Sequence, residues 1–412
     1  MSRTPPRIVW YLSPAVIAGL VLLIASPHVC RAAAEEERPI IQTFVDDVDI
    51  AVIDLRGLGG QENWSSITTT PAGGALVGLS NRDGSAALVE FDHRTRSIRP
   101  VMGLQETGRL MPGEHEPKVH VSPWLAPDGW YYFLSHYGLE THLPLHGSRI
   151  GYDGMRWWRC RYLPSEQRWQ SEHLGRVMTA DGAVAVRGDA RHQHVWAVTF
   201  PKSHLVRIDL AGGALHDLGR SNAVYAPRQI LLSSDGRPLV LDHRGRFWTT
   251  DHDHRRLIPT QASIPVDHEI SGDLLAQGLV AACLDTQTST WYATSAWGRL
   301  YAINAQDAES PIVRDLGAPL DQLSGDDEPR RASRPPMIAG IALAGDDQLY
   351  LAVSGYNRAA DPDGHSLVVR CDRDGRHAER VAAMDGTQVN YLCGSDAATD
   401  KGRRLYFAGS HL

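Results

Sequence analysis

Short apolar or alternating runs, broken by Asp-Gly, Gly-Gly and Asn/Asp-rich turns, recur along most of this chain and constrain its fold more than any other feature. One copy of the unit runs from His194 to Arg220, and another runs from Thr290 to Gly317. Each copy has a strand ending in Thr or Ser, a polar loop, a second strand, a turn, and a last strand that closes on Asp-Leu-Gly. After the N-terminal segment the sequence shows no convincing amphipathic helix. The pattern predicts an all-β fold made of repeats.

With the preceding strand added, the units start near Trp64, Lys118, Ala183, Tyr225, Leu275, Pro336 and Gln388. A spacing of roughly 40 to 65 residues is typical of propeller blades with loop insertions. The last unit ends after two strands, while Phe44–Leu55 is strand-like and has no unit of its own. We therefore expect a seven-bladed β-propeller whose N-terminal strand closes the last blade, which removes exposed sheet edges. Six or eight blades are the alternatives.

The N-terminal segment has the order of a secretory signal. Its first seven residues carry two arginines and no acid, an apolar run extends from about Ile8 to Ser26, and small residues precede Glu35. We expect residues 1–34 to be a signal peptide cleaved after Ala34, and residues 35–412 to form one propeller domain. An uncleaved membrane anchor is the alternative, because the apolar run is long enough to span a bilayer. In both cases we expect a body outside the cytoplasm, either secreted or periplasmic, or tethered to the membrane.

Composition limits the class of partner. The chain of 412 residues is 42% hydrophobic and 22% charged, which is typical of a globular protein with a large core. Its net charge of -7 gives no reason to expect a nucleic acid. The four cysteines of the body each lie in an apolar run without a CxxC or zinc-type spacing, so we expect buried free thiols. A disulfide between Cys371 and Cys393 is the alternative.

Propellers usually bind ligands at one mouth of the central channel, which two sets of loops surround. The loops that lead into the innermost strands offer Glu62, Asn63, Lys118, His120, Arg187, Tyr225, Arg228, Gln277, Asn390 and Tyr391. The loops between second and third strands offer Arg82, His136, Tyr137, His142, His146, Lys202, His204, His243, Trp297, Tyr356, Asn357 and His411. This predicted mouth is rich in His, Arg, Lys and Tyr and poor in carboxylates. Its local charge is therefore expected to be positive, opposite in sign to the net charge of the chain.

Such a mouth suits an acidic sugar. Arginine and lysine can bind a uronate carboxylate, and this neutralisation makes the proton on the adjacent carbon easier to remove. Histidine or tyrosine can take that proton and return one to the departing glycosidic oxygen, which is β-elimination. We therefore expect an anionic oligosaccharide or polysaccharide as the partner. The side chains expected to bind it are Lys118, Arg187, His204, Gln277 and Tyr391.

The periodicity resembles the superfamily of secreted seven-bladed propellers, which includes quinoprotein-like and gluconolactonase-like propellers and several polysaccharide lyases. The stretch Lys118–Gly138 (KVHVSPWLAPDGWYYFLSHYG) also resembles ulvan-lyase-type propellers. In both, one histidine enters an inner strand and a second follows the next strand, across an Asp-Gly turn. The resemblance implies a polysaccharide lyase in which His120 and His136 are the acid/base pair, supported by Tyr225 and Arg228.

Other functions stay open at this point. In oligogalacturonate-lyase-type propellers a His-rich mouth holds a metal, and that resemblance implies a divalent ion bound by His120, His136, His204 and Gln277. The Glu62-Asn63 pair is similar to the metal-binding start of gluconolactonase-like propellers, although the further Asn and Asp of that site are not evident. The alternatives are a metal-dependent hydrolase or lactonase and a non-catalytic propeller that binds a ligand or a protein.

Two further motifs are interpreted without a function. The DHDH sequence at Asp251–His254 is expected to be a solvated outer hairpin turn. The DPDGH sequence at Asp361–His365 mimics the start of a calcium loop but lacks its later acidic ligand, so we expect a turn there as well.

Overall fold

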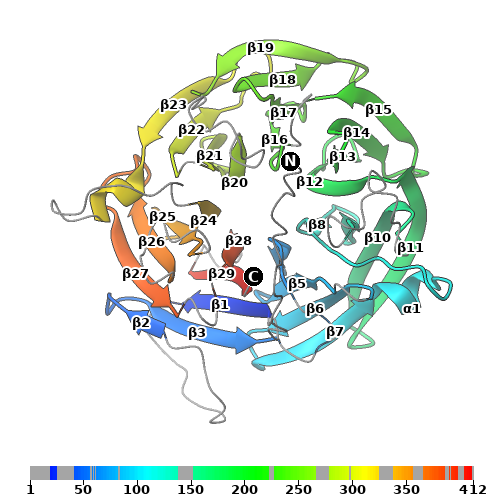
Figure 1. Cartoon of the computed structure of the whole chain (residues 1–412), viewed down its shortest axis with the longest axis horizontal. Helices are drawn as coiled ribbons and strands as arrows, with labels where there is room; N and C mark the ends of the chain where they lie inside the picture. The colour runs from blue at the N-terminus through cyan, green and yellow to red at the C-terminus, as the bar shows by residue number, and fades with distance from the viewer. Residues whose placement is uncertain are drawn as a thin grey trace, which may run out of the picture.

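The predicted runs form short antiparallel strands, and the sheets that they build stand around a central axis (Figure 1). The computed structural model describes residues 19–25, 41–55, 58, 60, 62–81, 84–137, 152–221, 227–265, 278–296, 298–323, 337–355, 365–385, 389, 391–397 and 403–410. Within these ranges one short α-helix, α1 (Leu104–Gly108), and one 3-10 helix, η3 (Pro319–Leu323), interrupt the strands. The all-β propeller predicted from the sequence is confirmed.

Six blades each take their four main strands from one continuous run of chain. The first three blades are β4 (Ile67–Thr69), β5 (Ala75–Leu79), β6 (Ala87–Asp92) and β7 (Ser97–Gly103); β8 (Trp124–Leu125), β9 (Tyr131–Leu134), β10 (Gly154–Leu163) and β11 (Arg168–Thr179); and β12 (Gly182–Asp189), β13 (His194–Phe200), β14 (His204–Asp209) and β15 (Leu215–Arg220). The next three are β16 (Leu231–Leu232), β17 (Pro238–Leu241), β18 (Arg246–Thr250) and β19 (Leu257–Ser263); β20 (Leu279–Asp285), β21 (Thr290–Ser295), β22 (Leu300–Asn304) and β23 (Ile312–Gly317); and β24 (Ile338–Leu343), β25 (Gln348–Val353), β26 (Ser366–Asp372) and β27 (Glu379–Met384). The last of these also takes β2 (Ile41–Thr43), which pairs with β27.

A composite sheet joins the two ends of the chain. Its strands, in order, are β28 (Tyr391–Ala397), β29 (Arg404–Ser410), β1 (Gly19–Ala25) and β3 (Asp49–Asp54). The prediction of seven blades with an N-terminal strand closing the last one is therefore wrong in its count: six blades use continuous chain, and the remaining sheet is assembled from both ends. The strand within 44–55 lies in one sheet with the C-terminal strands, as predicted, but β1 stands between them and pairs with both β29 and β3. Without β1, one edge of β29 would leave its backbone N–H and C=O groups unpaired. Residues 19–25 form β1 and pair with this edge.

Side chains on opposite faces of one strand pack against different neighbouring sheets. On β5, Val77 packs in a cluster with Ala408 of β29, whereas Leu76 packs in another with Phe133 of β9. Both faces of such a strand are buried, so every residue of β5, β9 and β17 is buried. This burial explains why the middle strands are apolar throughout rather than alternating.

The described residues also settle the state of the cysteines. Cys160, Cys371 and Cys393 are buried free thiols, as predicted, and Cys283 is a half-buried one, so Cys371 and Cys393 form no disulfide. Among the helices of the described residues, none has the length and apolar character needed to cross a membrane. The expected cleavage point after Ala34 lies outside the described residues, so the signal peptide and its anchor alternative remain predictions.

Candidate functional site

Five of the predicted site residues lie together where the innermost strands begin. Lys118 and His120 precede β8, His136 follows β9, Arg228 precedes β16, and Tyr391 begins β28. Their mutual proximity shows in ring contacts and in charge effects that each exerts on the others. We call these five residues, together with Trp64 that packs on them, the basic mouth.

Backbone pairing fixes the two histidines and the lysine relative to one another. Lys118 and His136 form an antiparallel bridge, and the His136 N–H donates to the Lys118 carbonyl oxygen at 2.9 Å. His120 lies two residues further along the same chain, on the same side as Lys118. The rings of His120 and His136 have centroids 5.2 Å apart. The pair predicted from the sequence is therefore a real structural pair.

His136 is held in one tautomer. Its Nδ1 lies 2.8 Å from the carbonyl oxygen of Tyr137, and because a carbonyl only accepts, Nδ1 carries the proton and Nε2 keeps its lone pair. The ring packs on Tyr137, with centroids 4.1 Å apart, and stacks on Phe200. On another side lies Gly182, where an added Cβ would come within 2.9 Å of the His136 Cα and ring. His136 therefore has little freedom to move.

Burial and neighbouring cations keep both imidazoles uncharged. Burial, then the charge of Lys118, then His136 and Arg228 lower the pKa of His120 well below its ordinary range. Burial and then Lys118 do the same to the pKa of His136, against the opposing hydrogen bond to Tyr137. The Nδ1 atom of His120 is buried and has no hydrogen-bond partner among the described residues. Such an atom is one that a ligand could satisfy.

Trp64 and Tyr391 complete the basic mouth. The Nζ atom of Lys118 lies 3.7 Å from the centroid of the Trp64 ring, and that ring lies 5.6 Å from the ring of Tyr391. Trp64 is itself held by Glu62, to which its Nε1–H donates at 2.6 Å. Burial raises the pKa of the Tyr391 hydroxyl, and the Arg228 guanidinium beside it works against that rise. Sequence reasoning missed Trp64, although it directly follows the Glu62-Asn63 pair in the same loop.

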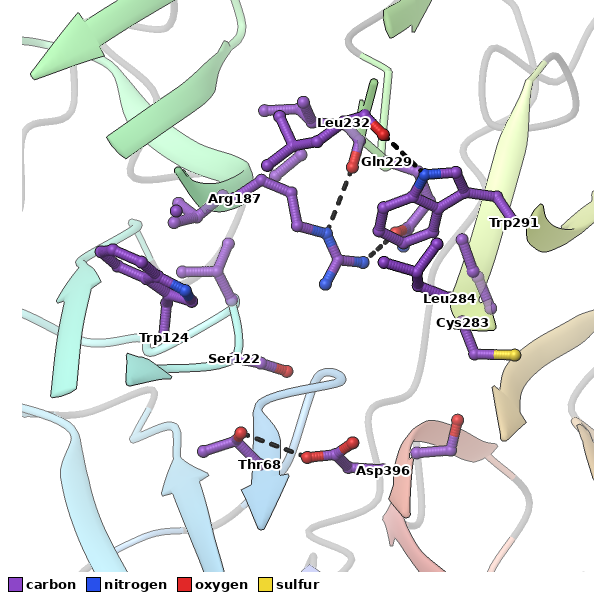
Figure 2. A pocket seen from close by; sticks show the side chains of 18 of the residues that line it. Thr68, Ser122, Trp124, Arg187, Gln229, Leu232, Cys283, Leu284, Trp291 and Asp396 are labelled. Atoms are coloured by element: carbon purple, nitrogen blue, oxygen red, sulfur yellow. Dashed lines mark hydrogen bonds between the residues drawn. The ribbon is translucent and has the colours of Figure 1, made fainter. Parts of the chain in front are cut away.

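The central channel continues away from the basic mouth as a cavity of about 790 Å³. His120 and Arg228 line it, whereas Lys118, His136 and Tyr391 do not. Figure 2 shows the guanidinium of Arg187 pointing into this space. Arg187 lies near the end of β12, away from the strand beginnings that carry the basic mouth. Its Nε–H donates to the carbonyl oxygen of Ile230 at 3.2 Å. Arg187 was expected in a loop, but it lies within β12 and is a channel residue rather than part of the basic mouth.

The wall opposite Arg187 carries an acid that the sequence did not suggest. One carboxylate oxygen of Asp396 accepts from the backbone N–H of Thr69 at 2.7 Å and from the hydroxyls of Thr68 and Thr69 (Figure 2). This contact joins β28 to β4 across two sheets. Burial lowers the pKa of Arg187, and Asp396 acts in the opposite direction. Asp396 stands within a strand, so no loop rule would have selected it.

Other predicted residues are not brought to the basic mouth. His204 begins β14, two strands out from the axis, and its Nδ1 lies 2.8 Å from a carboxylate oxygen of Asp217. The prediction gave the correct end of the propeller axis for His204, but this residue lies farther from the axis than predicted. Asn63 donates to the carbonyl oxygens of Ser66 and Gly78, so its amide fixes backbone. Tyr225 and Gln277 lie outside the described residues, and so do Arg82, His142, His146, Trp297, Tyr356, Asn357, Asn390 and His411.

No family model and no curated protein matches the chain. A catalytically inactive virginiamycin B lyase from Staphylococcus aureus, solved with quinupristin, is similar at 10% identity with a TM-score of 0.53, covering 90% of this chain and 99% of that one. The likeness is one of fold.

Two further solved structures are similar at lower scores. A protein from Lactobacillus plantarum is 14% identical with a TM-score of 0.49, covering 82% of this chain and 85% of that one. The β-propeller domain of Cps50 (Swd1) from Myceliophteria thermophila is 10% identical with a TM-score of 0.48, covering 84% and 96%. None of these identities transfers a residue's role to this chain.

Proposed function

We propose that this protein binds an anionic saccharide at the basic mouth and cleaves it by β-elimination. The observation that carries the proposal is the pair of buried, uncharged imidazoles, His120 and His136, set 5.2 Å apart beside two cations. A general base must be unprotonated to act, and both rings meet this condition at neutral pH. Of the basic mouth, Arg228 and His120 line the cavity, so within it they are the two side chains that would contact the sugar.

In this reaction Arg228 binds the uronate carboxylate, and the charge of Lys118 adds to the positive potential. His120 takes the proton from the carbon next to the carboxylate. The electron pair of that C–H bond forms the new double bond, the bond to the glycosidic oxygen breaks, and the imidazolium returns the proton to the departing oxygen. His136 stays neutral and so does not repel the imidazolium that forms beside it.

The low pKa of His120 has a consequence for this cycle. Two of its causes are the charges of Lys118 and Arg228. A bound carboxylate would offset those charges, so the imidazole would become more basic when the substrate is in place. The base would then be strongest at the moment when it is needed.

The test is product formation on a panel of polyuronates, such as polygalacturonate, alginate and ulvan, followed by the ultraviolet absorbance of the unsaturated uronate. His120→Ala should reduce the rate by about 10²-fold or more, the size expected for a lost general base. His204→Ala is the matched control, because His204 lies off the channel and pairs with Asp217. Binding of a polyuronate without product would contradict the lyase step and leave a binding propeller.

The export of the protein belongs to the same proposal. A polysaccharide substrate would be met outside the cytoplasm, which agrees with residues 1–34 acting as a signal or as an anchor. Removal of those residues would also remove β1 from the composite sheet. The intact mass of protein recovered from cells distinguishes the two, since cleavage after Ala34 gives a shorter chain and an anchor does not.

A further inference from the structure

One group of described side chains away from the basic mouth has the donor types and spacing of a metal site. Asp189, His192 and His194 each offer one ligand atom, and these atoms lie within 4.8 Å of one another. Asp189 ends β12, His194 begins β13, and His192 lies in the turn between them. This position is at the ends of the innermost strands, whereas the basic mouth lies at their beginnings.

A third histidine, His254, packs against the group from the next blade. His254 lies in the turn between β18 and β19, and its ring centroid is 5.3 Å from that of His192 and 5.4 Å from that of His194. The ring also stacks on Trp196, which is completely buried. The DHDH sequence is an outer turn, as expected, but full solvation is wrong for His254, because this packing half-buries it.

The carboxylate of Asp189 is already oriented toward the imidazoles. Its Oδ1 accepts the backbone N–H groups of Arg191 at 2.9 Å and of His192 at 3.3 Å. Its Oδ2 lies 2.5 Å from Nδ1 of His192 and 3.3 Å from Nε2 of His194. One oxygen therefore anchors the turn, and the other faces the two rings.

Two nitrogens of the group are buried without a hydrogen bond. These atoms are Nε2 of His194, a residue only 4% exposed, and Nδ1 of His254. Neither finds a hydrogen-bond partner within the part of the chain that the structure describes. Buried polar atoms are normally paired, so two orphaned imidazole nitrogens beside a carboxylate point to a cation as the missing partner.

The neighbouring backbone leaves room for the group. Gly236, between β16 and β17, has a φ of +82°, and a Cβ added there would lie 2.1 Å from Oδ2 of Asp189 and 2.8 Å from Nδ1 of His192. Arg207 places a positive charge beside the group, since its Nη1–H donates to the His254 carbonyl oxygen at 3.4 Å. That charge is paired with Asp209 at 3.0 Å.

We propose that Asp189, His192, His194 and His254 bind one divalent transition-metal ion, with zinc as the best fit, and that this ion links two neighbouring blades. Three imidazoles and one carboxylate suit zinc, nickel or copper and not magnesium or calcium, which prefer oxygen ligands alone. Asp189, His192 and His194 supply the ligand atoms that lie within 4.8 Å of one another, and the His254 ring, 5.3 Å from that of His192, would close on the bound ion as the fourth ligand. A site with four protein ligands stabilises the fold rather than taking part in catalysis. His192, 36% exposed, provides the path by which the ion enters. The site does not depend on the lyase proposal.

The experiment uses the full chain without an affinity tag, stripped with a chelator and then given zinc chloride. After desalting, wild type should retain one zinc per chain and unfold at a higher temperature than the stripped protein. His192→Ala and His254→Ala should each weaken zinc binding by about tenfold or more. His252→Ala is the matched control, because it lies in the same turn as His254 but is 78% exposed. Cobalt in place of zinc should give a visible absorption band that the two variants lose.

Three results would overturn the proposal. The first is wild type that binds no more zinc than the His192→Ala variant, which is altered at an exposed position and should still fold. The second is His252→Ala that loses as much zinc as His254→Ala, which would indicate adventitious surface binding. If His192→Ala loses the ion and a folded His254→Ala keeps it, the link between the blades is refuted.

Discussion

The imidazoles of His120 and His136 lie 5.2 Å apart because the backbone of His136 pairs with that of Lys118, two residues before His120. Diagonal neighbours across an antiparallel bridge lie at such distances. The relation between the two rings therefore comes from this single backbone bridge, which lies outside the named strands. A site fixed in this way is pre-organised for binding.

Gly182→Ala should disturb the basic mouth without touching a charged residue. The new Cβ would come within 2.9 Å of the Cα of His136, and backbone cannot yield as a flexible side chain can. We expect a loss of about 1–3 kcal/mol in the free energy of unfolding, together with reduced activity. Urea denaturation measures the first. Gly84→Ala is the control, because its nearest neighbour is the side-chain amide of Asn81 at 3.2 Å, and equal losses in both variants would contradict this account.

Stability should fall on mild acidification in a way that depends on His120. Burial lowers its folded-state pKa well below the value of about 6.5 expected in the unfolded chain, so the unfolded state takes up the proton first as the pH falls. This contribution to the free energy of unfolding is complete above about pH 6.5 and declines below it, by about 1.4 kcal/mol per pH unit. His120→Asn should show a shallower decline between about pH 7.5 and 5.5. Parallel curves for the two proteins would refute the buried neutral imidazole.

Arg187 should matter for long ligands only. It lines the channel below the basic mouth and is already hydrogen-bonded to Ile230 and Gln229, so a short oligosaccharide held at Arg228 would not reach it. Arg187→Gln should leave the affinity for a monouronate unchanged and lower that for a longer oligouronate. A calorimetric titration with both ligands tests this, and an equal loss for the two would place Arg187 in the first binding position instead.

Trp158→Ala should destabilise the propeller strongly. The indole is completely buried between two sheets, in a cluster with Leu88 and Phe133. Truncation of such a side chain costs about 3–5 kcal/mol. Met111→Ala, at a position 65% exposed, should change the free energy of unfolding by less than about 0.5 kcal/mol. Chemical denaturation that finds similar stabilities for the two variants would show that the cluster is not part of the stabilising core.

The repeat and part of the candidate site could be predicted from the sequence. Turn residues between apolar runs are local signals, so the starts of the units could be read without the structure. The rule that places loops at one mouth brought Lys118, His120 and Arg228 together correctly. It could not give the distance of a residue from the axis, and for that reason His204 was included although it lies two strands out.

The remaining errors concern contacts between distant parts of the chain. Pairing of residues 19–25 with β29 joins segments at opposite ends of the sequence, and no local pattern encodes it. The solvated state of His254 was predicted from the residues of its own turn alone. Its partners His192 and His194 lie in the preceding blade, about 60 residues earlier in the sequence. A short His-x-His motif next to Asp189 was the available signal, and it gained meaning only when the fold placed His254 against it.

The central claim is that the basic mouth binds an anion, and calorimetric titration of an oligogalacturonate tests it most directly. Arg228→Gln should weaken binding by about tenfold or more, as expected for a lost hydrogen bond to a charged group, and Lys118→Met should weaken it less because Lys118 acts through its charge alone. Arg220→Gln, an exposed residue on the outer strand β15, should bind as wild type does. If wild type binds with an affinity that falls as salt is added, and Arg228→Gln binds about tenfold or more weakly, the account holds; equal affinity in wild type and Arg228→Gln would contradict it.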